Sequence, residues 1–116
     1  MARLVFKIVA EQEWRDAETT GVFHGSAVDC QDGFIHFSTS AQVRATAARH
    51  FAGRRDLLIV AVDAEVLALR WEPSRGGDLF PHLYSSLSLT AARGVRPLPL
   101  GADDAHQFPA DWDIAP

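Results

Sequence analysis

The chain has 116 residues, of which 47% are hydrophobic and 22% are charged, so its composition is that of one globular domain and excludes a disordered chain. Eleven Lys and Arg against 15 Asp and Glu give a net charge of −4. This charge argues against binding to long nucleic acids, because such binding requires clustered cations. The single cysteine, Cys30, excludes a disulfide within the chain.

The first half of the chain predicts two strands and one helix before residue 32. Residues 4–9 are largely apolar and alternate in the way that indicates a strand buried on at least one face. Residues 11–19 predict a short helix that ends at Gly21. Segment 22–32 starts with an apolar pair and continues with turn-forming residues, so we expect a short strand followed by a loop.

A strand and a second helix are expected next. Residues 32–39 predict a strand, which is entered through an Asp-Gly turn. Thr39 and Gln42 fit a capping box, with Thr39 as the N-cap of a helix that continues to about His50. The predicted buried stripe of this helix recurs every fourth residue and consists of Val43, Ala47 and Phe51.

The second half of the chain reads mainly as strands. Residues 57–62 form a continuous apolar run, which predicts a central strand covered on both faces. Alternation at 67–72 and 86–90 predicts two further strands, and Pro-containing 80–84 predicts another extended segment. Residues 101–116 predict an irregular tail.

Helices do not alternate regularly with the strands, so a doubly wound parallel sheet is not expected. We predict a single compact α+β domain over residues 1–116, with mixed or antiparallel sheets and two helices. The N-terminal segment lacks the apolar core of a signal peptide, and no apolar run approaches membrane-spanning length. We therefore expect a cytoplasmic protein of bacterial type without a membrane partner, while its oligomeric state stays open.

Two of the predicted strands each place a histidine, a hydroxyl group and an aromatic ring on one face. These residues are Phe34, His36 and Ser38 in the first strand, and Phe80, His82 and Tyr84 in the second. If both faces meet, they form an aromatic-walled pocket for a small ligand, in which His82 is the acid or base and His36 bonds to ribose or phosphate. The alternative for either histidine is a core residue bonded to a carbonyl group.

Three further candidates flank this pocket. Ser38 and Thr39 stand at the predicted helix N-terminus, where free N–H groups and the helix dipole would favour an anion, although capping alone also explains Thr39. Glu72 is a candidate pocket carboxylate, and its alternative is a surface ion pair with Arg70 or Arg75. The His and Asp residues lack metal-ligand spacing, so no metal site is expected.

The blocks DGFIHFSTSAQV (32–43) and RWEPSRGGDLFPHLY (70–84), together with the opening FKI…W, resemble the bacterial domain-of-unknown-function family 952 over essentially the whole chain. This resemblance implies a distant relationship to the fold of ADP-ribosyltransferases. His24, with Gly25 and Ser26, resembles the strand end that holds nicotinamide adenine dinucleotide (NAD) in several of these enzymes. The resemblance thus implies NAD as ligand and ADP-ribosyl or phosphoryl transfer as activity.

Two other functions stay open at this point. His36, Phe37 and Ser38 form one of the two His-x-Ser/Thr motifs of two-histidine phosphoesterases, but the second candidate motif ends in Tyr84. A non-catalytic module that binds a small ligand would need the same pocket without turnover.

Overall fold

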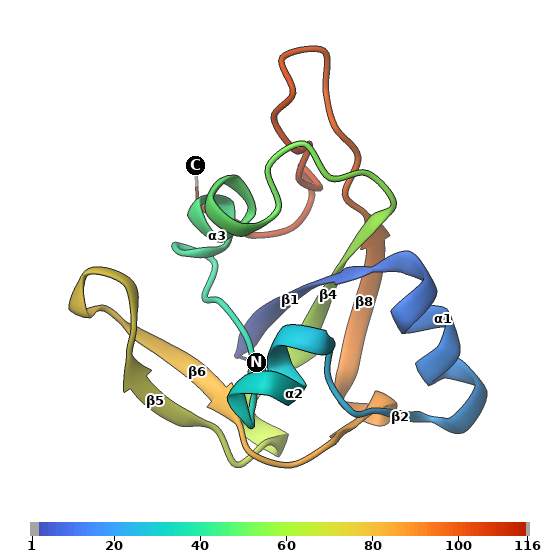
Figure 1. Ribbon diagram of the computed structural model, residues 1–116, viewed down its shortest axis with the longest axis vertical. Coiled ribbons are helices and arrows are strands. Elements are labelled where there is room, and N and C mark those ends of the chain that lie inside the picture. The colour runs from blue at the N-terminus through green and yellow to red at the C-terminus, as the bar shows by residue number, and fades with distance from the viewer. Residues whose placement is uncertain (1–2, 116) are drawn as a thin grey trace.

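The computed structural model describes residues 3–115, and at residue 75 the backbone alone. Within this range the chain forms three α-helices and eight strands, which pair into three antiparallel sheets (Figure 1). The predicted α+β class is therefore confirmed. None of the helices in the described part of the chain has the length and apolar character that a membrane crossing requires.

The largest sheet contains β1 (Leu4–Ala10), β4 (Leu57–Asp63) and β8 (Ala92–Pro97), with β4 in the middle. All residues of β4 are buried, because other parts of the chain pack on both faces of the sheet, as the apolar run predicts. The strand β8 was not predicted from the sequence, since Gly94 and Pro97 interrupt its apolar pattern. In the described part of the chain, the edge of β1 that faces away from β4 pairs with no strand and forms one isolated bridge, between Phe6 and Ser38.

A second sheet contains β3 (Ile35–His36), β6 (Leu79–Leu83) and β5 (Arg70–Pro73), with β6 in the middle. Strand β3 is shorter than predicted because the chain leaves β6 after two residues and crosses to the first sheet. There Ser38 forms an antiparallel bridge with Phe6, and each backbone N–H donates to the other residue's carbonyl group. This bridge holds the two sheets together at the edge of β1.

The third sheet is a two-residue pair of β2 (Val22–Phe23) and β7 (Leu87–Ser88). The alternation at 86–90 therefore predicted a longer strand than the chain forms, since a 3-10 turn, η3 (Leu89–Ala91), follows directly. Two more such turns, η1 (Ala64–Val66) and η2 (Arg75–Gly77), connect neighbouring strands.

Helices α1 (Glu11–Thr20) and α3 (Val43–His50) match the two predicted helices. Helix α1 ends at Gly21, whose φ of 81° lies in the left-handed region, as predicted. Helix α3 begins four residues later than the expected N-cap at Thr39. The side chain of Gln42 still accepts a hydrogen bond from the Thr39 N–H (3.0 Å), so the capping contact is confirmed while residues 40–42 form a turn.

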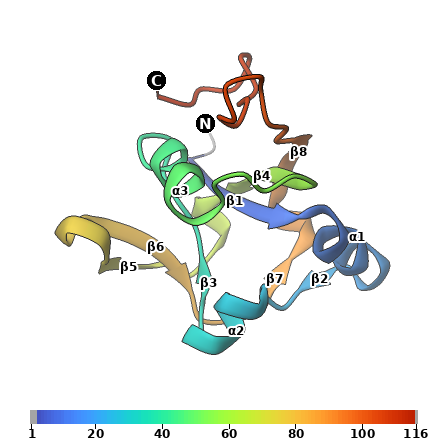
Figure 2. The same cartoon turned by 45° about the horizontal axis from the view of Figure 1, so that its top comes forward.

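Helix α2 (Ala27–Asp32) lies where the sequence predicted a loop, so that prediction is wrong. The helix forms because Ser26 caps it: Asp29 N–H donates to the Ser26 hydroxyl group, and the Asp29 carboxylate accepts from Ser26 N–H. Gly33 ends the helix at a φ of 87°. In Figures 1 and 2, α2 and α3 lie apart from each other, and β3 with the following segment connects them.

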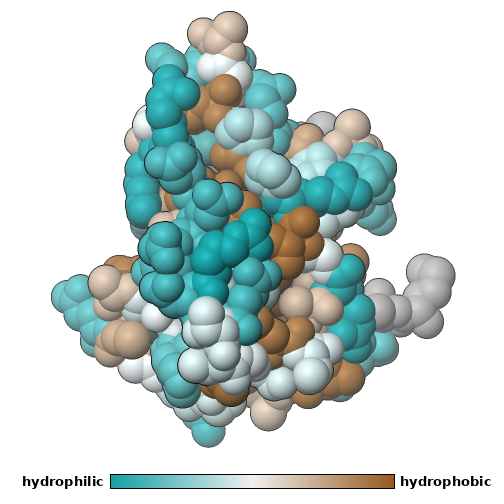
Figure 3. All heavy atoms as spheres, turned by 90° about the vertical axis from the view of Figure 1, so that its right-hand side faces the viewer, coloured by the Kyte–Doolittle hydropathy of each residue, from teal (hydrophilic) through white to brown (hydrophobic). Residues whose placement is uncertain are grey.

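The core lies in two clusters, one on each face of the first sheet. The first cluster lies on the side of α1 and α2 and includes Val5, Val9, Trp14, Phe23 and Ile35. The second lies on the side of α3 and includes Phe6, Ile8, Val43, Ala47 and Leu98. The tail after residue 100 is irregular, as predicted, and Phe108 and Trp112 pack on the second cluster. On the face shown in Figure 3, hydrophobic residues appear as strips between hydrophilic ones.

Candidate functional site

The two histidines singled out in the sequence lie side by side. His36 in β3 and His82 in β6 are directly opposed in the antiparallel register, so their side chains project from the same face of the sheet. Their ring centroids are 5.6 Å apart, and the ring of Phe34 lies against both, at 4.6 Å from His36 and 4.0 Å from His82. The prediction that both histidines open into one cleft is confirmed.

The orientation of His82 is fixed by its neighbour on β5. Nδ1 of His82 lies 2.8 Å from Oε1 of Glu72, and the Tyr84 hydroxyl group donates to the same oxygen at 2.7 Å. Hydrogen bonds from Tyr84 and His82 hold the pKa of Glu72 below its usual value, and the bond to Glu72 raises the pKa of Tyr84. Among residues 3–115, Nε2 of His82 has no hydrogen-bond partner, so this nitrogen is free for a ligand.

Glu72 and Tyr84, both predicted to bind the ligand, are hydrogen-bonded to each other, and their ligand-binding roles stay predictions. Glu72 is engaged by His82 and Tyr84, and it forms no ion pair with Arg70, whose guanidinium group lies 5.2 Å from the centre of the Tyr84 ring. Tyr84 is about half exposed at 49%, and its hydroxyl group points to Glu72. Both residues orient His82, which makes the second motif of a two-histidine phosphoesterase a poor fit.

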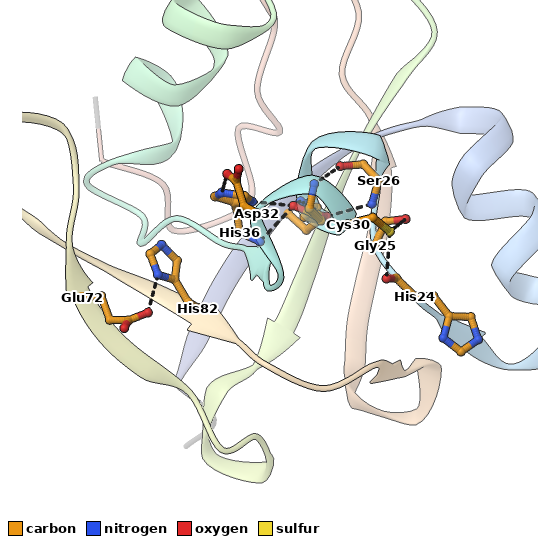
Figure 4. Close-up of polar contacts among 10 residues, drawn as sticks. His24, Gly25, Ser26, Cys30, Asp32, His36, Glu72 and His82 are labelled. Atoms are coloured by element: carbon orange, nitrogen blue, oxygen red, sulfur yellow. Dashed lines mark hydrogen bonds and ion pairs between the residues drawn. The ribbon is translucent and has the colours of Figure 1, made fainter.

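His36 is held by carboxylates at both ring nitrogens. Nδ1 lies 2.6 Å from Oδ1 of Asp29, and Nε2 lies 2.9 Å from Oδ2 of Asp32. Figure 4 shows His36 beside Asp32. A ligand therefore reaches Nε2 of His36 only by displacing Asp32. A direct bond from His36 to ribose or phosphate stays a prediction, and the two histidines differ in that both ring nitrogens of His36 are occupied.

Asp29 is the buried centre of the charged groups behind His36. Its side chain is 1% exposed and accepts from Lys7 Nζ at 2.8 Å, in addition to His36 and the Ser26 N–H. Burial alone would raise the pKa of Asp29, but the hydrogen bond from His36 and the charge and hydrogen bond of Lys7 outweigh it and hold that pKa well below the usual range. Burial lowers the pKa of Lys7, and Asp29 opposes this effect.

A cleft of about 590 Å³ opens between α2 and α3, along the free edge of β1. Its volume lies in the range of small-molecule sites. The wall on the α2 side includes Ser26, Val28 and Asp32, and the wall on the α3 side includes Thr46, His50 and Phe51. His36, His82 and the buried Phe80 close one part of the cleft, and Ile8 lies on its floor.

The backbone of Ile8 offers an unpaired donor and acceptor to this cleft. Alternate residues of β1 bond to β4, as the Glu11 N–H bond to the Asp56 carbonyl group shows, so the even-numbered residues face the free edge. The backbone N–H and C=O of Phe6 both bond to the backbone of Ser38, and Ala10 N–H donates to the Glu13 side chain. Ile8 N–H and C=O have no partner within the described range. Ile8 borders the cleft, so both groups are available to a ligand or to water.

Ser38 and Thr39, the residues of the predicted anion site, are bonded to neighbouring side chains. Oγ of Ser38 is 2.8 Å from the Thr46 hydroxyl oxygen, and the Thr39 N–H donates to Gln42. Ser38 borders the cleft as a buried residue, and an anion at this turn stays a prediction.

His24 does not join the histidine pair. Its ring is exposed and points away from the other labelled residues in Figure 4, and it does not border the cleft. Its carbonyl group lies 3.7 Å from Sγ of Cys30. A ligand role of the His24 side chain therefore lies outside this cleft and stays a prediction. Residues 3–115 contain no group of side chains suited to a metal ion.

We expect Gly25→Ala to destabilise the protein by about 1–3 kcal/mol, because Gly25 combines a φ of 108° with a close approach to helix α2. A Cβ at this position would lie 2.8 Å from Cβ of Asp29. Gly21→Ala is the matched control, since Gly21 also has a positive φ but open space around it. Urea unfolding of both variants measures the difference, and equal losses would show that the approach to Asp29 does not matter.

Three residues of the candidate site were missed in the sequence. The Ser26-x-x-Asp29 pattern is a capping signature, and it would have indicated both α2 and the engaged Asp29. Lys7 stands alone in the apolar run of β1, which is the signal of a buried charge with a partner. The free edge at Ile8 has no sequence signal, because it depends on which strands pair with β1.

Comparisons with known proteins name a family but no activity. Residues 8–95 match the family model described as "Protein of unknown function (DUF952)". The crystal structure of protein CC0527 from Caulobacter crescentus is similar, with 46% identity, a TM-score of 0.86, and coverage of 90% of this chain and 93% of that chain. The solution NMR structure of CC0527 is also similar, with 46% identity, a TM-score of 0.81, and coverage of 90% and 91%. No curated protein matches the sequence.

Proposed function

The chain belongs to the DUF952 family of proteins of unknown function, and from its cleft we propose that it binds a nucleotide-like ligand of the NAD type, on which His82 acts as general acid or base. The observation that carries this proposal is the fixed orientation of His82, whose Nδ1 is held by Glu72 while Nε2 is free. A histidine anchored in this way is the usual form of a catalytic acid or base.

The floor of the cleft supports the proposed ligand class. Ile8 offers one N–H donor and one carbonyl acceptor side by side, and a carboxamide group complements both in one plane. The nicotinamide group of NAD carries such a carboxamide. The resemblance to ADP-ribosyltransferases points to the same ligand, although it rests on different residues.

The proposed reaction uses His82 as a base. When its ring is neutral, Nδ1–H donates to Glu72, and Nε2 carries the lone pair. Nε2 then takes the proton of an acceptor hydroxyl group, which is water in the simplest case. The acceptor oxygen bonds to C1′ of the ribose, the C1′–N bond to nicotinamide breaks, and nicotinamide leaves as a neutral molecule.

Two ligands that differ at one group test the binding part of the proposal. We expect nicotinamide mononucleotide to bind about 10- to 100-fold more tightly than nicotinic acid mononucleotide, because a carboxylate cannot donate to the Ile8 carbonyl group and leaves it unpaired. Isothermal titration calorimetry measures both affinities. Equal affinities, or a failure of both ligands to bind, would contradict the proposal.

Product analysis tests the catalytic part. Release of nicotinamide from NAD, followed by chromatography, is the expected result for ADP-ribosyl transfer to water. Saturable binding without any product would instead assign the chain to the non-catalytic ligand-binding modules, which the occupied nitrogens of His36 also favour.

A further inference from the structure

Four side chains in contact form a continuous row from the core to the cleft. The row runs from Lys7 to Asp29, His36 and Asp32, with contacts of 2.8, 2.6 and 2.9 Å. Exposure increases along it, from 5% and 1% for the side chains of Lys7 and Asp29 to 34% and 43% for those of His36 and Asp32. Asp32 is therefore the end of the row that a ligand meets.

The fold holds Asp32 in a defined position. Asp32 is the last residue of α2, and Gly33 turns the chain so that β3 runs back beside the helix. This turn brings His36 against Asp32, and His36 itself is fixed by the buried Asp29. An exposed carboxylate normally rotates in solvent, whereas Oδ2 of Asp32 is held by Nε2 of His36.

The other oxygen of Asp32 is available to a ligand. Oδ1 of Asp32 has no hydrogen-bond partner in the part of the chain that the structure describes, and Asp32 borders the cleft. An oriented carboxylate accepts hydrogen bonds from neighbouring hydroxyl groups, as acidic residues do with ribose in dinucleotide sites. The same charge repels a phosphate group at that place.

We propose that Asp32 is a specificity-determining residue that accepts hydrogen bonds from the vicinal hydroxyl groups of a ribose, and that His36 is the positioning residue behind it. This inference rests on the proposed nucleotide ligand and narrows it to ribonucleotides with a free 2′-hydroxyl group. The competing explanation is structural: the contact between Asp32 and His36 only fastens the end of α2 to β3.

Calorimetric titration of nicotinamide mononucleotide and its 2′-deoxy analogue tests the inference, because this nucleotide has a single ribose. We expect the wild-type protein to bind the ribonucleotide about 10- to 100-fold more tightly, since a hydrogen bond to a charged acceptor is lost in the analogue. Asp32→Asn should remove most of this preference while its affinity for the deoxy analogue stays within about twofold of wild type.

Asp113→Asn is the matched control, because Asp113 is exposed and does not border the cleft. It should keep the full preference for ribose. If the wild-type protein binds both nucleotides equally, or if Asp32→Asn keeps the preference, the assignment to Asp32 is wrong while the proposed function stands. If neither nucleotide binds to the wild-type protein, both proposals are wrong.

Discussion

His82→Asn is expected to lower the release of nicotinamide from NAD by about 10²–10⁴-fold, the usual contribution of a positioned acid or base. Asparagine fits the space of the histidine ring but cannot accept and return a proton at neutral pH. Its affinity for nicotinamide mononucleotide should change little, because the carboxamide bonds to the backbone of Ile8 and not to His82. Steady-state kinetics and calorimetry on the same preparation measure both effects.

Glu72→Gln is the matched variant for this experiment. It retains His82 but removes the negative charge beside Nδ1, which stabilises the ring when Nε2 takes up a proton. We expect a loss in kcat with little change in KM, since Glu72 positions His82 and does not contact the ligand. A purely structural role of His82 predicts a different pattern, in which both variants melt earlier and bind and react as the wild-type protein does.

The strands that were predicted well are those whose pattern is set by burial alone. Strand β4 is buried on both faces, so its apolar run identifies it without knowledge of its partners. Helix α2 was missed because six residues are too few for an apolar periodicity, and its evidence lies in the capping pattern of Ser26 and Asp29. Strand β8 was missed because Gly94 and Pro97 interrupt its apolar pattern.

The candidate site shows the same division between local and tertiary information. Alternation within β3 and β6 places His36 and His82 on inward faces, and pairing of these strands brings them together. The hydrogen-bond partners of each imidazole ring come from other elements of the fold, so no local sequence pattern predicts these contacts. Lys7 lies 22 residues before Asp29, and their contact exists only because α2 packs beside β1.

Asp29→Asn is expected to destabilise the protein by about 3–5 kcal/mol, because it leaves the ammonium group of Lys7 buried without its counter-ion. Urea unfolding at pH 7 measures this loss. Glu18→Gln is the control for an exposed ion pair, since Glu18 contacts Arg15 at 3.0 Å on the surface of α1, and it should cost less than about 1 kcal/mol. Equal losses in the two variants would contradict a buried ion pair.

The pH dependence of stability follows from the lowered pKa of Asp29. Because this pKa lies below that of an aspartate in the unfolded chain, about 3.9, the ionised Asp29 stabilises the folded state above that pH. The stabilisation is lost as the pH falls below that value and through the pKa of the folded state. Asp29→Asn should lack this acid-dependent component, so its free energy of unfolding should vary less than that of the wild-type protein below about pH 4.

The double variant Lys7→Met with Asp29→Asn distinguishes the cost of burying an unpaired charge from the cost of changing the side-chain shape. Lys7→Met alone leaves the carboxylate of Asp29 buried, but His36 and the Ser26 N–H still donate to it, so we expect a smaller loss than for Asp29→Asn. In the double variant no ammonium group remains to be neutralised, and much of the stability lost in Asp29→Asn should return. If the loss of stability in the double variant equals the sum of the two single losses, Lys7 and Asp29 act independently. The row of side chains that positions His36 then does not start at Lys7.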